Sequence, residues 1–146
     1  MRKRLTYTLA LAALLIAAVA VPSSIAAAKK SHKIDGTVTA RSLTGNIVTG
    51  TFKGSLGSGA VVYVVTSGPN GTQNLDITSF QSKGAFKAKA NVTLGTQPDG
   101  TTTVTGSGTV NGGSGAYKGA KGKFTTTGTI SSDGLITATI AGSAKY

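Results

Sequence analysis

A glycine-rich segment, residues 111–124, constrains the fold of this chain more than any other stretch. It holds five glycines, two of them adjacent, spaced around Tyr117, and it runs directly into Phe124 and a Thr/Gly stretch. Glycine has no Cβ, so it permits positive φ angles and the close approach of two backbones. The spacing therefore predicts a corner of fixed shape between two strands, with Tyr117 as its packing anchor.

Apolar residues after residue 28 recur with a period of two, and no segment shows the spacing of three and four that is typical of an amphipathic helix. In the clearest case one face is apolar, with Phe86, Ala88, Ala90, Val92 and Leu94. The other face of the same segment is polar, with Lys87, Lys89, Asn91 and Thr93. This pattern predicts antiparallel β-structure with one face in water.

Turn sequences divide this part of the chain at regular intervals: Gly68-Pro69-Asn70-Gly71, Pro98-Asp99-Gly100 and Asp133-Gly134. The expected strands are 33–40, 46–54, 59–66, 73–79, 84–94, 101–110, 121–131 and 135–145. Eight short strands without helices indicate a closed barrel or a sandwich. The strand at 59–66 is apolar on both faces, so we expect it to be covered on both sides.

Glycines that share a face with large apolar residues favour the barrel. They are Gly36, Gly50, Gly54, Gly106, Gly108, Gly122, Gly128 and Gly142. An inward glycine relieves crowding where a small barrel curls tightly, or leaves space for a ligand, whereas a two-sheet sandwich needs more bulk there. We therefore predict an eight-stranded antiparallel barrel.

Residues 112–124, Gly-Gly-Ser-Gly-Ala-Tyr-Lys-Gly-Ala-Lys-Gly-Lys-Phe, resemble the glycine-rich segment of the allene oxide cyclase and dirigent proteins. The resemblance implies an eight-stranded antiparallel barrel that binds apolar or aromatic small molecules and steers a cyclisation or a radical coupling. The acidic and polar cavity residues of that superfamily lie outside this segment. No position here matches them, so the resemblance supplies no catalytic residue.

The first 28 residues have the layout of a secretory signal peptide. A positive head at Arg2–Arg4 precedes an apolar run from Leu9 to Val21, and the small residues Ala26 and Ala28 fit cleavage after Ala28. The apolar run is shorter than the about 20 residues that span a membrane as a helix. We expect a signal helix at 1–28 and a barrel domain at 29–146, secreted by a bacterium, with no membrane span after processing.

The composition disfavours most enzyme chemistries. The chain has one histidine, His32, no cysteine and four acidic residues, all of them aspartates. A catalytic triad needs a base beside its nucleophile, and metal sites need clusters of ligating side chains. The glycine-rich segment matches neither phosphate-binding motif. We therefore expect no metal site, no cofactor and no catalytic residue.

Five residues are candidate contacts for a small apolar ligand inside the barrel. Phe52, Phe86 and Phe124 fall on the apolar face of their strands. Tyr63 and Asp76 are the polar residues that would decide between two functions. One is a barrel with a binding or structural role that holds an apolar molecule, and the other is a dirigent-like or cyclase-like activity on such a molecule. Ordinary core packing is the competing interpretation of the three phenylalanines.

The chain is strongly basic, with a net charge of +11. Lys118, Lys121 and Lys123 cluster at the glycine-rich corner, which suggests a surface for an anionic cell-wall polymer. The competing interpretation is that the lysines only keep the barrel soluble and protect its strands from pairing with other chains. Nucleic acid is not an expected partner, because Arg41 is the one arginine after residue 28 and no aromatic residue alternates with the lysines.

Overall fold

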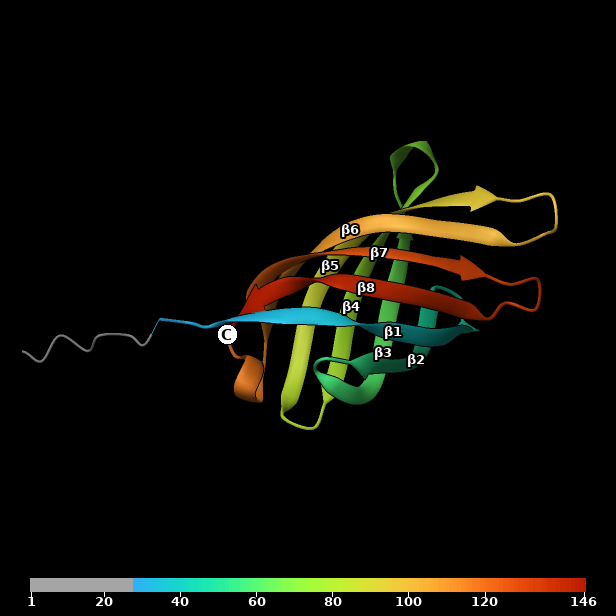
Figure 1. The fold of residues 1–146 in the computed structure, drawn as a ribbon. Coiled ribbons are helices and arrows are strands. Elements are labelled where there is room, and N and C mark those ends of the chain that lie inside the picture. The colour runs from blue at the N-terminus through green and yellow to red at the C-terminus, as the bar shows by residue number, and fades with distance from the viewer. Residues whose placement is uncertain (1–27) are drawn as a thin grey trace, which may run out of the picture.

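The computed structural model describes residues 28–146, so the signal helix expected at 1–28 lies outside the described residues apart from Ala28. Eight antiparallel strands follow one another around a closed barrel, and β1 pairs with β8 to close it (Figure 1). The strands are β1 (Ser31–Thr44), β2 (Ile47–Gly54), β3 (Gly57–Ser67), β4 (Thr72–Gln81), β5 (Gly84–Thr96), β6 (Thr102–Gly113), β7 (Lys121–Ile130) and β8 (Ile136–Lys145). The all-β, eight-stranded barrel is confirmed.

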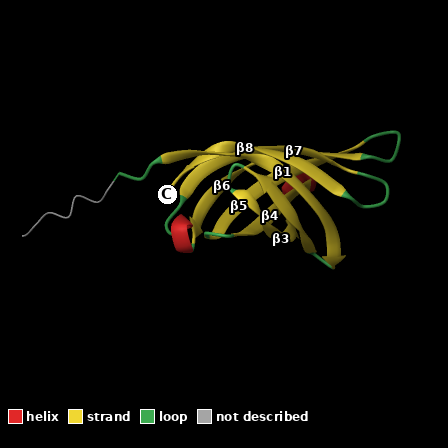
Figure 2. Cartoon of the chain, turned by 60° about the horizontal axis from the view of Figure 1, so that its bottom comes forward, coloured by secondary structure: helices red, strands yellow, loops and turns green. Residues whose placement is uncertain are grey.

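Turns and short end segments make up the rest of the described chain (Figure 2). Two single 3-10 turns occur, η1 (Pro69–Gly71) between β3 and β4 and η2 (Gly115–Tyr117) between β6 and β7. Asn70 has a left-handed φ of 55°, as the Asn-Gly turn signal predicts. Within residues 28–146 no helix is long and apolar enough to cross a membrane.

The glycine-rich corner closes one end of the barrel. Tyr117 is 3% exposed and stacks on Phe86, with 4.0 Å between ring centroids. The amide nitrogens of Ser114 and Ala116 donate to the carbonyl oxygens of Ala85 and Lys83, at 2.8 and 2.9 Å. These bonds fix the corner to the β4–β5 turn, and Tyr117 fills the space beneath it. The predicted corner and its anchor are confirmed.

Inward-facing glycines make room for phenylalanine rings. A Cβ added at Gly36 would lie 2.7 Å from the Phe52 ring, and one at Gly108 would lie 2.4 Å from the Phe124 ring. Atoms that close cannot coexist, so each ring occupies the volume that a side chain on the neighbouring strand would need. The inward glycines thus relieve crowding inside the closed barrel.

The outer face of β3 is not covered, contrary to the expectation for 59–66. Val64 is 39% exposed, and Phe80 on the neighbouring β4 is 51% exposed. A single closed sheet has only one interior, and no described element packs on its outside at this point. The outward valines are explained by the preference of β-branched residues for strands, which does not require burial.

Candidate ligand cavity

The main cavity of the barrel has a volume of about 490 Å³ and lies toward the end opposite the glycine-rich corner. Residues of the β1–β2 and β7–β8 turns, Gly45, Asn46 and Gly134, lie at its mouth. Its wall is mainly aliphatic, with Val38, Val65, Leu75, Val92, Val104 and Ile136. The volume falls in the range of about 300–1,000 Å³ that is usual for small-molecule sites.

Tyr63 lies at the inner end of this cavity. Together with Val38 it also lines a second, smaller space of about 50 Å³ nearer the closed end, so these two residues lie where the two spaces meet. Burial raises the pKa of the Tyr63 hydroxyl above its ordinary value, so the group stays neutral at physiological pH. Within residues 28–146 no protein group hydrogen-bonds to it, which leaves its proton available to a molecule in the cavity.

The three phenylalanines expected in the interior are there. Phe52, Phe86 and Phe124 are 4–7% exposed, and all three line the small inner space rather than the main cavity. Phe86 also stacks on Tyr117. The three rings therefore pack as core, and among the five candidate contacts Tyr63 alone lines the main cavity.

An interior position for Asp76 is wrong. Its side chain is exposed on the outer face of β4, where one carboxylate oxygen lies 3.5 Å from the Lys89 ammonium of β5. Leu75 and Ile77 on either side of it pack toward the core clusters instead. Because side chains along a strand alternate between faces, the aspartate between these two apolar residues must point outward.

Polar residues of the cavity wall were missed by the sequence reasoning. Thr126, which is 9% exposed, and Gln73 line the main cavity together with Ser42 and Ser67. The alternation that places Phe124 inside also places Thr126 inside, so the signal was present in the sequence. Of these residues only Thr126 is fully buried, and all four are uncharged.

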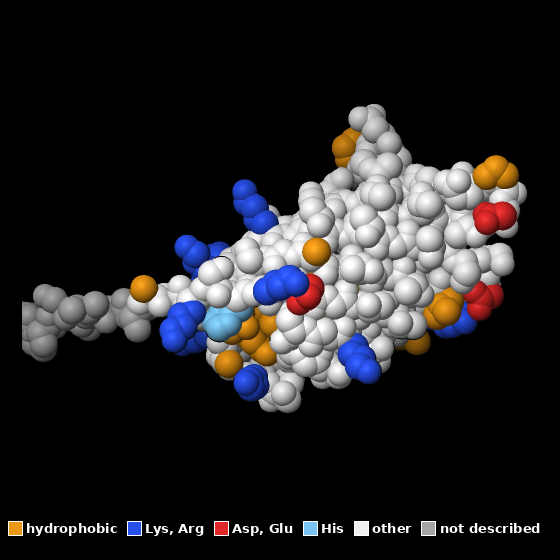
Figure 3. Space-filling model, in the orientation of Figure 1, with side chains coloured by type: hydrophobic (Ala, Val, Ile, Leu, Met, Phe, Trp, Pro, Cys, Tyr) orange, Lys and Arg blue, Asp and Glu red, His pale blue; other side chains and the backbone are white. Residues whose placement is uncertain are grey.

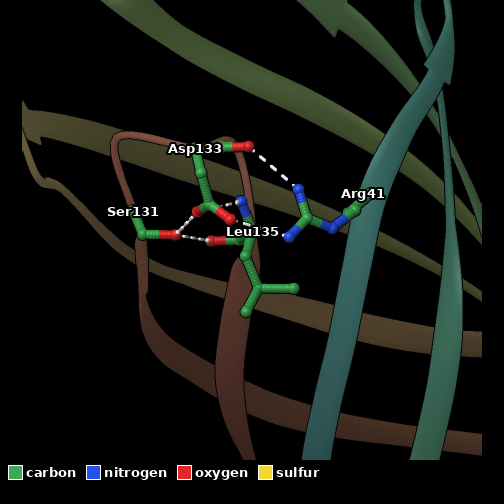
Figure 4. Close-up of polar contacts among 4 residues, drawn as sticks. All are labelled: Arg41, Ser131, Asp133 and Leu135. Carbon is green, nitrogen blue, oxygen red and sulfur yellow. Dashed lines mark hydrogen bonds and ion pairs between the residues drawn. The ribbon is translucent and has the colours of Figure 1, made fainter.

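A polar clamp fixes one side of the cavity mouth (Figure 4). Arg41 of β1 donates to the backbone oxygen of Asp133 at 2.9 Å and to its carboxylate at 2.8 Å. Ser131 and the amide of Leu135 donate to the other carboxylate oxygen. These hydrogen bonds, from Ser131 first and then from Arg41, lower the pKa of Asp133 to about 2. The β7–β8 turn is thereby held against β1.

The lysines expected to bind a polymer are only partly together. Lys121 and Lys123 point outward from β7, and Lys145 of β8 lies opposite Lys121. Lys118 belongs to the corner and does not line the depression that contains the other three. The sequence reasoning missed Lys145 because its proximity depends on the register of β7 and β8.

Fold and cavity together define an eight-stranded antiparallel barrel with an apolar chamber open at one end. Comparison of the chain with protein-family models, with curated proteins and with solved structures found no match. The resemblance of residues 112–124 to the allene oxide cyclase and dirigent proteins stays a prediction.

Proposed function

We propose that this chain is a secreted bacterial binding protein that holds a small, largely apolar molecule in its barrel. The observation that carries this proposal is the cavity of about 490 Å³, whose wall is mainly aliphatic and whose inner end presents the neutral Tyr63 hydroxyl. Ligand sites typically combine such an apolar wall with a few polar groups that orient the ligand. A hydrogen-bond acceptor at one end of the ligand would meet Tyr63.

Binding has more support than catalysis. Among the residues that line the main cavity, Tyr63 is the one titratable group, and its raised pKa keeps it protonated. General acid–base catalysis works best with a group whose pKa lies near the operating pH. Of the two polar residues that would favour a dirigent-like or cyclase-like activity, Tyr63 lies beside the cavity and Asp76 lies outside the barrel, so the cavity has no carboxylate. A neutral phenol can orient a ligand without taking its proton.

The expected affinity is modest. A ligand of the size of an aromatic side chain buries about 200 Å² of surface. At about 25 cal/mol per Å² this contributes about 5 kcal/mol. Part of that is offset by lost translational and rotational freedom. A net hydrogen bond to Tyr63 adds about 1 kcal/mol. Dissociation constants in the micromolar range or weaker follow for small ligands, and assays must cover that range.

A neutral fluorescent probe such as N-phenyl-1-naphthylamine tests the proposal without involving the lysines. We expect bright, saturable fluorescence with the full chain. Val104→Phe fills the cavity and should abolish it, whereas the matched outer-face variant Val62→Phe should not. Cooperative thermal unfolding of both variants checks that they are folded. If Val104→Phe binds as tightly as the parent, or if a panel of neutral apolar probes fails to bind, the proposal is wrong.

Tyr63→Phe then tests the role of the hydroxyl. A ligand with a carbonyl group should bind about five- to tenfold less tightly to the variant, which corresponds to about 1 kcal/mol. A pure hydrocarbon of similar shape should bind the variant and the parent equally. Equal loss of both ligands would mean that the substitution changes the shape of the cavity and that the hydroxyl orients nothing.

A further inference from the structure

Three lysines lie together on the outside of the barrel at its closed end. Lys121 of β7 and Lys145 of β8 are direct cross-strand partners, and Lys123 follows on the same face. Like charges directly opposite each other on a sheet are destabilising. Three ion pairs occur within residues 28–146: Lys33–Asp35, Arg41–Asp133 and Lys89–Asp76. No described carboxylate therefore forms an ion pair with Lys121, Lys123 or Lys145.

The three lysines surround a depression of about 570 Å³. Gly122 and Ala144, which have no bulky side chain, line its floor, and Ser31, Asn111 and Ser143 add polar groups around it. The Lys121 ammonium lies 3.4 Å from the backbone oxygen of Asn111. Figure 3 shows many of the blue side chains of this view at the same end, near the start of β1 and the end of the chain. The site is therefore a hollow with uncompensated positive charge.

This hollow continues into a second one of about 720 Å³, and the two share Thr109 and Lys123. The second hollow extends to Lys89 of β5 and Asn74 of β4. The register places Lys89 opposite Thr109 and Thr109 opposite Lys123, so the two lysines are two strand spacings apart, roughly 10 Å. We call the two joined hollows the track. From β4 to β1 the track crosses five strand spacings, roughly 24 Å.

A linear anion fits this track better than a single small ion. Lys121, Lys123 and Lys145 form one compact cluster of positive charge. Lys89, which is paired with Asp76, lies roughly 10 Å beyond Lys123, close to the length of two sugar rings in a linear chain. Between and beside them lie short hydroxyl and amide side chains, Asn91, Ser107, Thr109, Thr125 and Ser143. Such side chains pair with sugar hydroxyls, whereas nucleic-acid surfaces use arginines and outward aromatic rings for stacking. Neither kind of residue faces outward among those that line the track.

We propose that the outer face of β5 to β8, centred on Lys121, Lys123 and Lys145, binds an acidic polysaccharide through its carboxylates. The lysines supply the charge, and the hydroxyl and amide side chains supply contacts to the sugar rings. This surface is independent of the barrel cavity. It also differs from the lysine cluster expected from the sequence, because Lys145 and Lys89 belong to it and Lys118 does not.

The test measures binding of the full chain to polygalacturonate by calorimetry at low and at physiological salt, with dextran as the neutral control. The triple variant Lys121→Gln, Lys123→Gln, Lys145→Gln should bind about tenfold more weakly, since exposed charge pairs contribute a few tenths to 1 kcal/mol each. The matched control is Lys53→Gln, Lys83→Gln, Lys118→Gln. None of these three lysines lines either hollow, so this variant loses the same net charge without changing the lining and should change binding less than about twofold.

Three results would overturn the proposal. Equal weakening by the two triple variants would show that only net charge matters. Equal binding of dextran and polygalacturonate would remove the role of the carboxylates. Tighter binding of DNA than of polygalacturonate at the same salt would exclude a polysaccharide-specific surface. Thermal unfolding provides an independent readout, because removing the repulsion between Lys121 and Lys145 should leave the track variant at least as stable as the parent.

Discussion

Gly108→Ala tests whether the inward glycines are required by the packing of the barrel. A Cβ at Gly108 of β6 would lie 2.4 Å from the Cζ atom of Phe124 and 2.5 Å from the carbonyl oxygen of Lys89. Real Cβ atoms essentially never approach other heavy atoms that closely. The Phe124 ring could shift within the small inner space, but the Lys89 carbonyl belongs to β5 and can move only by distorting the β5–β6 pairing.

The expected loss of stability follows from two opposing terms. Overpacking a close-packed interior costs about 1–3 kcal/mol. Replacing glycine by alanine restricts the unfolded chain and returns about 0.4–1 kcal/mol. We therefore expect Gly108→Ala to lower the free energy of unfolding by about 1–2 kcal/mol. That is a substantial part of the 5–15 kcal/mol typical of whole domains.

Gly95→Ala near the end of β5 is the matched control. There a Cβ would meet only the Thr103 hydroxyl oxygen, at 2.8 Å, and that side chain can rotate away. We expect a change within about 0.5 kcal/mol, because the rotation costs Thr103 one hydrogen bond, to the Gly95 carbonyl, and the alanine restricts the unfolded chain.

Urea unfolding followed by circular dichroism measures both variants, since the chain has no tryptophan. If Gly108→Ala is as stable as Gly95→Ala, the packing explanation of the inward glycines is refuted. The double variant Gly108→Ala, Phe124→Leu separates the two contacts. The double variant should lose less free energy of unfolding than the two single variants lose together only if the contact with the Phe124 ring, and not the contact with the Lys89 carbonyl, dominates.

Three further outcomes are expected. Tyr117→Ala should lower the free energy of unfolding by about 3–5 kcal/mol, because it empties the space beneath the corner and removes the stacking on Phe86. Tyr117→Phe keeps the ring and should change the free energy of unfolding by less than about 0.5 kcal/mol. Because the pKa of Asp133 is lowered from 3.8 to about 2, its stabilising effect is complete above about pH 4 and is lost as the pH falls toward 2. Acid unfolding of Asp133→Asn should therefore lack this part of the pH dependence. Because the pKa of Tyr63 is raised, its contribution is present below about pH 10 and is lost as the pH rises. Burial also raises the pKa of Tyr117 and of Tyr146, so absorbance titration of the folded chain should show several tyrosines that ionise later than in urea. Tyr63→Phe should remove the latest of these steps, because the shift at Tyr63 is the largest.

The strands and the closed end could be predicted from the sequence because both are encoded locally. Alternation from Phe86 to Leu94 places β5, and the glycines around Tyr117 place the corner. Asp76 could have been assigned to the outer face on the same grounds, since Leu75 and Ile77 flank it. The outward valines of β3 misled the reasoning, because strand preference and burial give the same pattern.

The two candidate sites depend on information that is not local. Lys145 reaches Lys121 only through the β7–β8 register, which positions residues 24 apart in the sequence side by side. The main cavity depends on how closely β1, β3 and β5 approach one another once the sheet has closed. The alternation along each strand predicts which residues point inward, but it does not predict where their packing leaves a cavity.

The cavity and the track use opposite faces of β7. Thr126 faces the cavity, whereas Lys121 and Lys123 face outward, as the alternation of a strand requires. The cavity mouth lies at the end of the β7–β8 turn, and the three lysines lie toward the opposite end of the same two strands. A polymer on the track would therefore leave the mouth open.

We expect the neutral probe to bind equally well with and without saturating polygalacturonate. We also expect polygalacturonate to bind Val104→Phe as tightly as it binds the parent. Competition between the two would mean that the polymer covers the mouth, which would contradict the placement of the track on β5 to β8.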